Sequence, residues 1–365
     1  MDLNALLERY QTLLPWHLAR TKCFVSMILG VISSGSVQQH KAALGFSGAA
    51  QQQSVCSRIR HFLKDFKFDF SDYARAILEV SQIKGKLTLS LDRTNWKFGC
   101  IDINLLVLAV LVADQFSIPL LWKALPKKGN SNSQERKDLL QTFIDVFGAE
   151  RIGALTADRE FIGKPWVDYL IQHKIPFFIR IKENRLVEWS DDMKKHIGDF
   201  FQHLKEKQKR HIQFNLDGHQ LFFAGTRSTK GELVIVMSNQ DMGAKILEIY
   251  KKRWTIELLF GNCKKNGFNF EDTHLRHLDR IEKMFAVVCS ALLLCFMAGR
   301  IQEKKDATPF KKTLQTPAFS TFRRGFDFLR KLLIQTRDQA LKLILFLLRP
   351  PKKFHKIRCL QKIIG

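Results

Sequence analysis

The spacing of apolar residues changes character along the chain. Residues 1 to about 80 carry helical patterns, among them "SVQQHKAALGF" and "AAQQQSVCSRIRHFLKDF", which a "GFSG" break separates. Near residue 85 the period shortens: "KLTLSLD" alternates, and "INLLVLAVLVAD" is a nearly continuous apolar run, as in a buried strand. The change predicts a helical N-terminal region followed by a domain built on a β-sheet.

Strand and helix patterns then alternate up to about residue 182. "SIPLLWKAL" predicts a third strand, and "SNSQERKDLLQTFIDVFG" predicts a helix with Ser131 or Ser133 as its N-cap. "RIGALTADREF" predicts a short strand, "KPWVDYLIQHK" a helix and "IPFFIRIK" another strand. Three strands followed by helix, strand, helix and strand indicate an α/β domain with a mixed sheet.

The pattern is β-rich from about residue 183 to 245. "HIQFNLDGHQLFFAGTR" predicts a hairpin around Asp217-Gly218, and "GELVIVMS" predicts a further strand. From Lys304 onward the chain is basic and helix-like. We therefore expect a helical domain at 1–82, an α/β core at 83–182 and 246–303, a β-rich insertion at 183–245 and a basic helical region at 304–365.

The charge of the chain is strongly positive. Against 35 acidic residues stand 59 Lys and Arg, which gives a formal net charge of +24 and a pI near 9.9. Such a field favours polyanions, although a merely soluble, highly charged protein is the alternative. Arg58 and Arg60 lie in the second helical pattern, so the helices around "GFSG" form either a helix-turn-helix reader or a plain helical hairpin.

Cysteines and apolar runs argue against several classes of protein. The seven Cys form no CxxC pair and show no finger-like spacing to a His, so a structural zinc site is not expected. Their odd, scattered count suits reduced thiols in a cytosol, and we see no secretion signal. The apolar run Met284–Gly299 is about a turn short of a bilayer span, so we expect a buried core helix.

Two acids close predicted strands. Asp92 ends "LTLSLD" and Asp158 ends "GALTAD". Acids in such places point out of the carboxyl edge of a sheet, where the sites of α/β proteins lie, although an isolated acid there is often only a turn or N-cap residue. We expect Arg159 and Glu160 to be local scaffold for Asp158.

The segment "YKKRWTIELLFGNCK", residues 250–264, places one carboxylate among cations. On a continuous helix one stripe collects four of its polar side chains, namely Tyr250, Arg253, Glu257 and Lys264. The alternative is a solvated face with an ion pair between Arg253 and Glu257. Trp254 lies near the edge of the stripe, where packing is the default and stacking on a base is the alternative.

Three carboxylates would suit phosphoryl transfer with two metal ions. That chemistry needs carboxylates that hold two divalent cations, and Mg²⁺ takes only a few protein carboxylates. Two strand-end Asp and one helical Glu meet this need. In this interpretation Glu257 faces the metal, and the cations beside it face a phosphate backbone.

The same motifs carry a family resemblance. The spacing Tyr250-x2-Arg253-x3-Glu257-x6-Lys264 resembles the YREK signature of insertion-sequence DDE transposases, in family four of the insertion-sequence series. "LDRTNW" at 91–96 resembles that family's first-Asp block, and "TADREF" at 156–161 resembles its second. One relative carries a further Lys where Gly261 stands here, so that contact is missing or comes from Lys265.

The resemblance implies a fold and a chemistry. The fold would be an α/β, RNase H-like catalytic core with a β-rich insertion, and the activity would be cut-and-paste transposition through a DNA hairpin. Mg²⁺ would be the cofactor, with Mn²⁺ able to replace it, and its ligands would be the catalytic Asp92, Asp158 and Glu257. DNA contacts would come from Tyr250, Arg253 and Lys264, to which we add Trp254, Lys265, Arg58 and Arg60.

The expected partners are transposon-end and target DNA. Because cut-and-paste chemistry needs two ends held together, we expect a homodimer in the DNA complex. We expect no membrane association and a cytoplasmic, nucleoid-associated protein of a bacterium. The rivals are an RNase H-like nuclease that cuts without joining, a non-catalytic repressor derived from a transposase, and an anionic-membrane protein that uses its basic tail.

Overall fold

The chain divides into two compact units. The computed structural model describes residues 2–190, 193–311 and 316–350. The helical unit comprises Met1–Ile83, Asn95–Ile103 and Leu259–Gly365. The sheet unit comprises Lys84–Thr94 and Asn104–Leu258.

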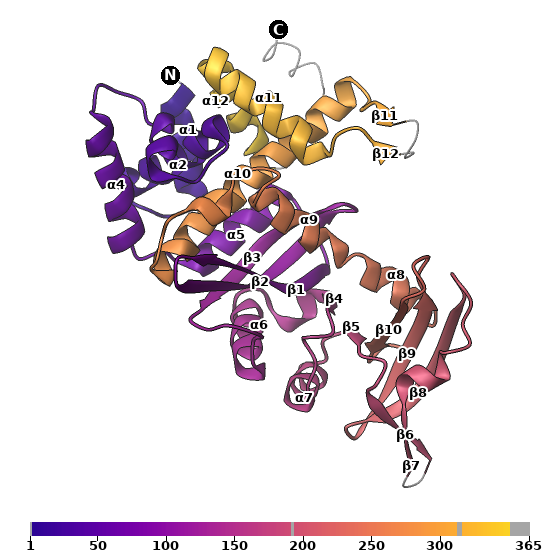
Figure 1. The fold of residues 1–365 in the computed structure, drawn as a ribbon. Coiled ribbons are helices and arrows are strands. Elements are labelled where there is room, and N and C mark those ends of the chain that lie inside the picture. The colour runs from indigo at the N-terminus through magenta and orange to yellow at the C-terminus, as the bar shows by residue number, and fades with distance from the viewer. Residues whose placement is uncertain (1, 191–192, 312–315, 351–365) are drawn as a thin grey trace. The chain divides into compact units, whose positions relative to one another are not determined.

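The helical unit is built around one long helix, α10 (Leu278–Lys305). It contacts α2 (Leu18–Ser34), α4 (Gln52–Asp65), α11 (Thr321–Gln335) and α12 (Arg337–Leu347), which gather around it in Figure 1. The residues from 281 to 296 are all buried. The apolar run is therefore the core helix that the sequence predicts.

Among the described residues, α10 is the one helix that by itself is long and apolar enough to cross a membrane. Inside this structure, however, 83% of its most apolar window is buried. The bent pair α2 and Gln39–Gly45 passes the same test only when its two parts are counted as one span. Burial of this kind is typical of a core helix. The basic tail beyond residue 350 lies outside the described residues.

Two helical segments flank the "GFSG" stretch, as the sequence predicts. Between α2 and α4 lie only α3 (Gln39–Ala42) and the 3₁₀ turn Ala43–Gly45. Together these two elements make the first predicted helix a short one, and both contact α4, so the helix-turn-helix and the plain hairpin both stay predictions. Arg58 and Arg60 of α4 are exposed. The remaining elements of this unit are α1 (Asp2–Leu13), α5 (Phe70–Ser81) and the short strands β11 (Phe310–Lys311) and β12 (Thr316–Pro317).

The sheet unit contains one continuous sheet of mixed direction. Its strands lie in the order β3-β2-β1-β4-β5-β10-β9-β8-β6-β7. β1, β4 and β5 pair in parallel, whereas β2 pairs antiparallel with β3, and β10 pairs antiparallel with both β5 and β9. The bounds are β1 Leu87–Phe98, β2 Ile101–Ala113, β3 Phe116–Leu125, β4 Ile152–Ala157, β5 Phe177–Ile181, β6 Leu186–Ser190, β7 Met193–His196, β8 Lys209–Leu216, β9 His219–Arg227 and β10 Leu233–Ser238.

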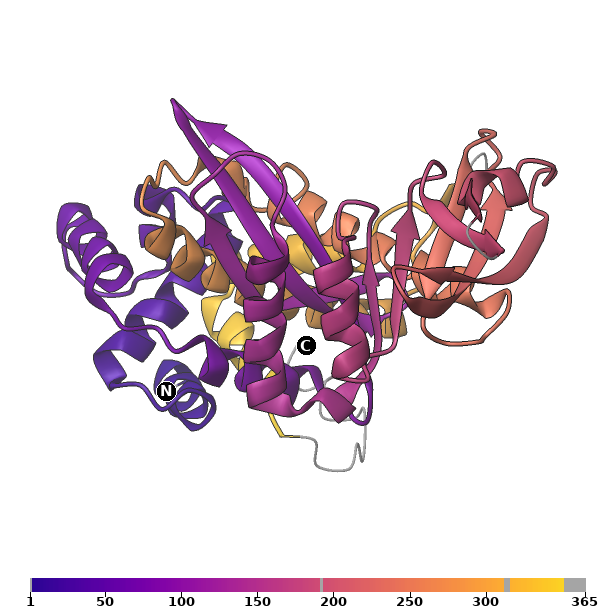
Figure 2. The same ribbon diagram turned by 90° about the horizontal axis from the view of Figure 1, so that it is seen from below.

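The β-rich stretch extends the core sheet. β10 pairs with β5, so the strands from β6 to β10 continue the same sheet. The helices α6 (Ser133–Phe147) and α7 (Lys164–Gln172) lie side by side, and α6 contacts β3 (Figure 2). The predicted α/β fold class, with a β-rich insertion and helical ends, is confirmed.

Two local predictions were wrong. The N-cap of α6 is Asn132, between the two Ser residues that the sequence suggested, because Asn132 and Glu135 form a capping box. Strand β1 does not end at Asp92 but runs on to Phe98. Alternation continues through the polar stretch, with Thr94 and Trp96 buried, and therefore the strand pattern does not stop at the acid.

Candidate active site

The two strand-borne acids lie beside each other. The parallel pairing of β1 with β4 ends at Leu91 and Ala157; Asp92 follows within β1, and Asp158 is the first residue after β4. Partners in a parallel ladder point to the same face. The register therefore places the two carboxylates together, although Asp92 lies within its strand and not at its end.

A buried polar pair ties the two strands just before these acids. Ser90 and Thr156 are register partners two residues before Asp92 and Asp158, and their hydroxyls lie 2.8 Å apart. Thr156 also donates to the carbonyl oxygen of Leu89 at 3.1 Å. Side chains two residues apart share a face of a strand, so this pair lies under the carboxylates and fixes the strands that carry them.

The third acid lies after a break in the helix. The predicted continuous helix over 250–264 is wrong: α8 (Lys245–Lys251) ends, α9 (Trp254–Cys263) begins, and Lys264 follows α9. Across the break the backbone N–H groups donate three residues back, as Arg253 does to Tyr250 at 2.9 Å and Ile256 to Arg253 at 3.0 Å. This 3₁₀ spacing puts Tyr250 and Arg253 in line.

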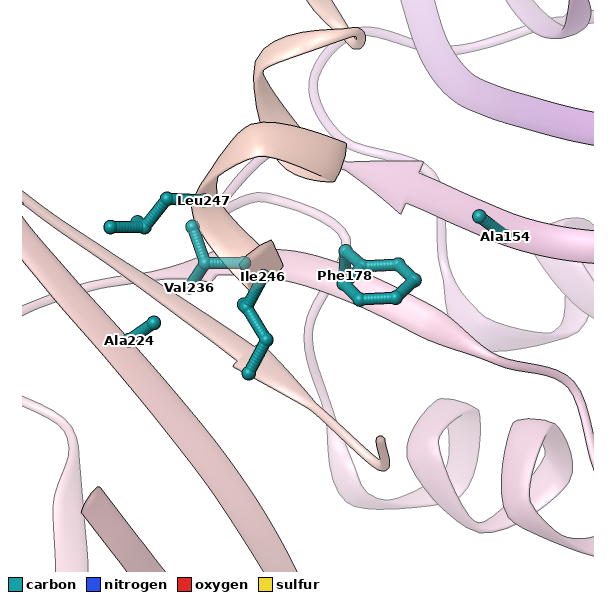
Figure 3. Packing of buried hydrophobic residues seen from close by; sticks show 6 residues of the cluster. All are labelled: Ala154, Phe178, Ala224, Val236, Ile246 and Leu247. Carbon is teal, nitrogen blue, oxygen red and sulfur yellow. The ribbon is translucent and has the colours of Figure 1, made fainter. Parts of the chain in front are cut away.

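Helix α8 is fixed on the sheet by a buried apolar cluster. Figure 3 shows its six members: Ala154, Phe178, Ala224, Val236, Ile246 and Leu247. Two of them come from α8 and four from β4, β5, β9 and β10. Tyr250 packs against this cluster at the end of α8, so the cluster fixes the position of its phenol.

The start of α9 is fixed by hydroxyls. Thr255, which is buried, donates to the carbonyl oxygen of Lys252 at 2.8 Å and makes a hydrogen bond with the buried Ser117 of β3. Ile256 beside it is fully buried. These contacts fix the turn that carries Arg253 and the first turn of α9, which carries Glu257.

Arg253 and Tyr250 contact the acids directly. The guanidinium of Arg253 donates from Nη1 to Oδ2 of Asp92 at 3.0 Å and from Nη2 to Oε1 of Glu257. It also lies over the ring of Tyr250, 5.6 Å from the centroid. The hydroxyl of Tyr250 donates to Oδ1 of Asp158 at 3.2 Å. Tyr250 and Arg253 therefore contact both strand-borne acids. The side chain of Arg253 is only 10% exposed, so this face of the segment is not the solvated face of the alternative interpretation.

Burial controls the ionisation of this cluster. It raises the pKa of Asp92 to about 6, although Arg253 and the backbone N–H of Arg93 act in the opposite direction; Glu160 and Asp158 add to the rise. Burial also raises the pKa of Tyr250 to about 12. For Arg253 burial acts to lower the pKa, but Tyr250 and Asp92 raise it above its ordinary value, so the guanidinium stays charged.

A comparison with protein families identifies the domain. A model described as the transposase DDE domain matches residues 85–294, which is more than half of the chain. The chain belongs to the transposase DDE domain family. The matched span contains all three acids of the cluster and ends within α10.

Further comparisons add little to the DDE domain match. A cryo-EM structure of a piggyBac transposase synaptic complex with hairpin DNA covers 94% of this chain and 79% of its own. Its sequence identity is 12% and its TM-score is 0.45, so this likeness carries no argument about function. No curated protein matches the chain.

The three acids of the cluster, Asp92, Asp158 and Glu257, have the donor chemistry of a magnesium site, since Mg²⁺ prefers carboxylate oxygens. Among the described residues, however, no three His, Cys, Asp or Glu side chains are arranged to hold a metal ion. The guanidinium of Arg253 instead takes one oxygen of Asp92 and one of Glu257. The three acids therefore have the chemistry of a divalent-cation site, but in this arrangement two of them bind a guanidinium.

The other predicted site residues fall in several places. Trp254 is 57% exposed, so the expectation that it packs by default was wrong. In the helical unit, Lys264 pairs with Glu271 at 2.6 Å, donates to the carbonyl oxygen of Asn95 at 3.3 Å and lies over the ring of Trp96. Lys265 is exposed.

Several polar groups that hold the three acids of the cluster were not predicted from the sequence. These are Ser90, Thr156, Ser117, Thr255, Arg93 and Arg136. A hydroxyl residue stands two positions before each strand-borne acid, in "SLD" and "TAD". Because strands alternate, that spacing was a signal for the Ser90–Thr156 pair. Nothing in the sequence marked the contact between Ser117 and Thr255.

Proposed function

We propose that the chain is a DNA transposase that cuts and joins DNA by phosphoryl transfer with divalent cations. Asp92, Asp158 and Glu257 would be its catalytic metal ligands. The observation that carries the proposal is the register of Asp92 beside Asp158, with Glu257 joined to Asp92 through one guanidinium. This cluster lies in a domain of the transposase DDE family.

The residues of the chain have distinct parts in this reaction. When bound, Mg²⁺ (or Mn²⁺ in its place) would stabilise charge on the attacking and leaving oxygens. Burial disfavours the charged form of Asp92 and raises its pKa, and a cation beside the carboxylate would offset that cost. Ser90 and Thr156 would keep the strands that carry Asp92 and Asp158 in register.

Arg253 and Tyr250 would change partners in the reaction. Without DNA they occupy oxygens of the three carboxylates. When cations take those oxygens, the guanidinium and the phenol would turn to a phosphate of the DNA backbone, for which a guanidinium has matching geometry. Glu257 would then be released for metal, as the sequence analysis expected.

The remaining details follow the resemblance to insertion-sequence transposases of family four and its YREK signature. A 3′-hydroxyl freed at the transposon end would attack the opposite strand, and the resulting hairpin would open before the end joins target DNA. Two protomers would hold two ends together in the bacterial cytoplasm, at the nucleoid. Contacts to the terminal inverted repeats would come from Tyr250, Arg253, Trp254, Lys264, Lys265, Arg58 and Arg60.

The decisive experiment compares the wild-type chain with Glu257→Gln. Each protein is incubated with labelled DNA that carries the sequence flanking its coding region, in Mg²⁺ or in EDTA. We expect nicking and a hairpin product only from the wild type and only in Mg²⁺; Glu257→Gln should give neither product in either condition. Product that is cut but never joined to a second DNA would indicate an RNase H-like nuclease instead.

A second candidate is a non-catalytic DNA-binding repressor. The observation that favours it is the pairing of Arg253 with two carboxylates, because a cluster neutralised by a guanidinium can persist without metal. Tight binding of the end DNA in EDTA, with no cleavage by either protein in Mg²⁺ or Mn²⁺, would favour this repressor over the transposase.

A further inference from the structure

An ion pair joins the two segments that carry the strand-borne acids. Arg93 follows Asp92, and Glu160 lies two residues after Asp158. Nε of Arg93 donates to Oε1 of Glu160 at 2.8 Å, and Nη2 donates to Oε2 at 2.9 Å. The two side chains are only 16% and 22% exposed. A guanidinium that donates two bonds to one carboxylate fixes both distance and orientation, which one flexible bond does not.

The loop around Glu160 is itself fixed by a buried cation. Arg136 of α6 is 4% exposed, and its Nη2 donates to the carbonyl oxygen of Glu160 at 3.0 Å. Its Nε donates to Oγ of Ser131 at 2.9 Å, and its guanidinium lies 5.2 Å from the ring centroid of Phe161. Loss of either hydrogen bond would leave a buried polar group unsatisfied, so the turn after β4 has little freedom to move.

The side chains of Arg93 and Glu160 bond to each other and not to the carboxylate of Asp92. The guanidinium of Arg93 donates to the carboxylate of Glu160 and, at 2.8 Å, to Oδ1 of Asn130. It does not donate to Asp92. Its backbone N–H donates to Oδ1 of Asp92 at 2.8 Å. Arg93 thus orients Asp92 through its backbone and ties its strand to the turn after Asp158 through its side chain. Arg253, by contrast, occupies a carboxylate oxygen that a cation would need.

We propose that Arg93 and Glu160 are positioning residues, which set the separation and orientation of Asp92 and Asp158 for a divalent cation. The inference rests on the proposed function, since it assumes that these acids hold metal. It extends the role of Glu160 beyond local scaffold for Asp158, because the same side chain also fixes the segment of the first acid.

Binding of Mn²⁺ tests the proposal without any reaction. The full chain is titrated with Mn²⁺ in the absence of DNA, and free Mn²⁺ is followed by its electron paramagnetic resonance signal. Arg93→Ala and Glu160→Ala should each weaken Mn²⁺ binding about tenfold, as loss of a residue that orients metal ligands does. The double variant should be no weaker than either single variant, because the pair acts as one unit.

Controls separate positioning from general damage. Arg185→Ala removes an ion pair with Asp217 in the same unit and contacts neither acid, so its Mn²⁺ affinity should match the wild type. Glu160→Gln keeps the shape of the side chain and should weaken Mn²⁺ binding with little loss of thermal stability. DNA binding in EDTA should be unchanged in every variant, since neither Arg93 nor Glu160 is assigned a DNA contact.

Several outcomes would overturn the proposal. Additive losses in the double variant would make Glu160 a metal ligand in its own right. If the Mn²⁺ affinities of the single variants lie within twofold of the wild type, the pair is an ordinary ion pair with no positioning role. If Arg93→Ala binds DNA more weakly in EDTA, Arg93 is a phosphate contact. Wild-type protein that binds Mn²⁺ without cutting DNA contradicts the proposed function alone, whereas wild-type protein that binds no Mn²⁺ contradicts both.

Discussion

The strand-borne and helix-borne acids of the candidate site are held in different ways. Asp92 is 15% exposed, and both of its carboxylate oxygens accept hydrogen bonds, from the Arg93 backbone and from Arg253. Glu257 is 36% exposed and pairs with Arg253, whose guanidinium it shares with Asp92. The strands are tied to each other below their acids, whereas α9 follows a break and passes from the sheet unit into the helical unit.

A three-acid site held in these two ways can be both rigid and adjustable. The two strand-borne acids are preorganised by sheet register and by buried hydrogen bonds, so they need little rearrangement to accept a cation. The helix-borne acid is positioned by a side chain that also occupies the site. We therefore expect substitutions of the strand-borne acids to change cleavage and stability through the loss of a carboxylate charge. Substitutions around α9 should act by changing how readily a metal ion replaces Arg253 at the carboxylates.

The largest effect is expected for Asp92→Asn. Cleavage should fall by roughly 10³-fold or more, because a carboxylate that we propose as a metal ligand is lost. The metal-free protein should nevertheless be more stable at pH 7. A carboxyl whose pKa is about 6 in the folded chain and 3.8 when unfolded disfavours folding once ionised, by roughly 3 kcal/mol. Urea unfolding in EDTA measures this gain.

The pH dependence gives the sign of this effect. Since the folded pKa is the higher one, the destabilisation is fully present above pH 6 and disappears as the pH falls from 6 to 3.8. The stability advantage of Asp92→Asn over the wild type should shrink across the same range. An Asn variant that is less stable than the wild type at pH 7 in EDTA would mean that Arg253 already compensates the charge of Asp92.

The sequence predicted the strand-borne half of the site better than the helix-borne half. Alternation and acids after apolar runs located Asp92 and Asp158, because register in a parallel sheet is a local consequence of strand pattern. The sequence pattern placed the end of β1 too early, since a polar stretch of a hairpin strand looks like a loop. The β-rich stretch was recognised, but its union with the core sheet depends on the pairing of β10 with β5, far away in sequence.

The helix-borne half depends on backbone geometry that spacing does not reveal. A continuous helix at 100° per residue put Tyr250, Arg253 and Glu257 on one stripe, and the structure does bring them together. It does so through a 3₁₀ break, whose cause is tertiary: α8 packs on the sheet and Thr255 is held by Ser117. Trp254, for which packing was the default expectation, is exposed.

A smaller but more specific effect is expected for Arg253→Gln. Without DNA the variant should bind Mn²⁺ about tenfold more tightly, because no guanidinium competes for the oxygens of Asp92 and Glu257 and a nearby positive charge is removed. DNA cleavage should still fall, because the proposed phosphate contact is lost. Electron paramagnetic resonance of Mn²⁺ measures the affinity, and a gel assay measures the cleavage.

Arg253→Lys is the matched control for Arg253→Gln. It keeps the charge but cannot donate two bonds in a plane, so it should fall between the wild type and the Gln variant in Mn²⁺ affinity. Weaker Mn²⁺ binding by Arg253→Gln than by the wild type would show that the guanidinium organises the carboxylates and does not compete with metal for them.

The smallest effects should come from the two buried hydroxyl pairs, Ser90–Thr156 near the strand-borne acids and Ser117–Thr255 near Glu257. Substitutions in these two pairs compare the two halves of the site most directly. Ser90→Ala and Ser117→Ala each remove one partner of a buried pair, but Thr156 and Thr255 keep a backbone acceptor. Each variant should therefore lose only about 1 kcal/mol of unfolding free energy in urea. Ser90→Ala should retain its affinity for Mn²⁺, because Arg93 and Glu160 still tie the two strands.

Ser117→Ala should instead lower the rate of DNA cleavage several-fold at saturating Mg²⁺, because α9 loses a tie to β3 and Glu257 then samples more positions. The equal cost in stability makes the two variants a matched pair, so any difference in cleavage reports on positioning and not on folding. Equal cleavage rates would mean that the packing of α8 and of Ile256 alone holds the helix-borne acid, and that both halves of the site are rigid.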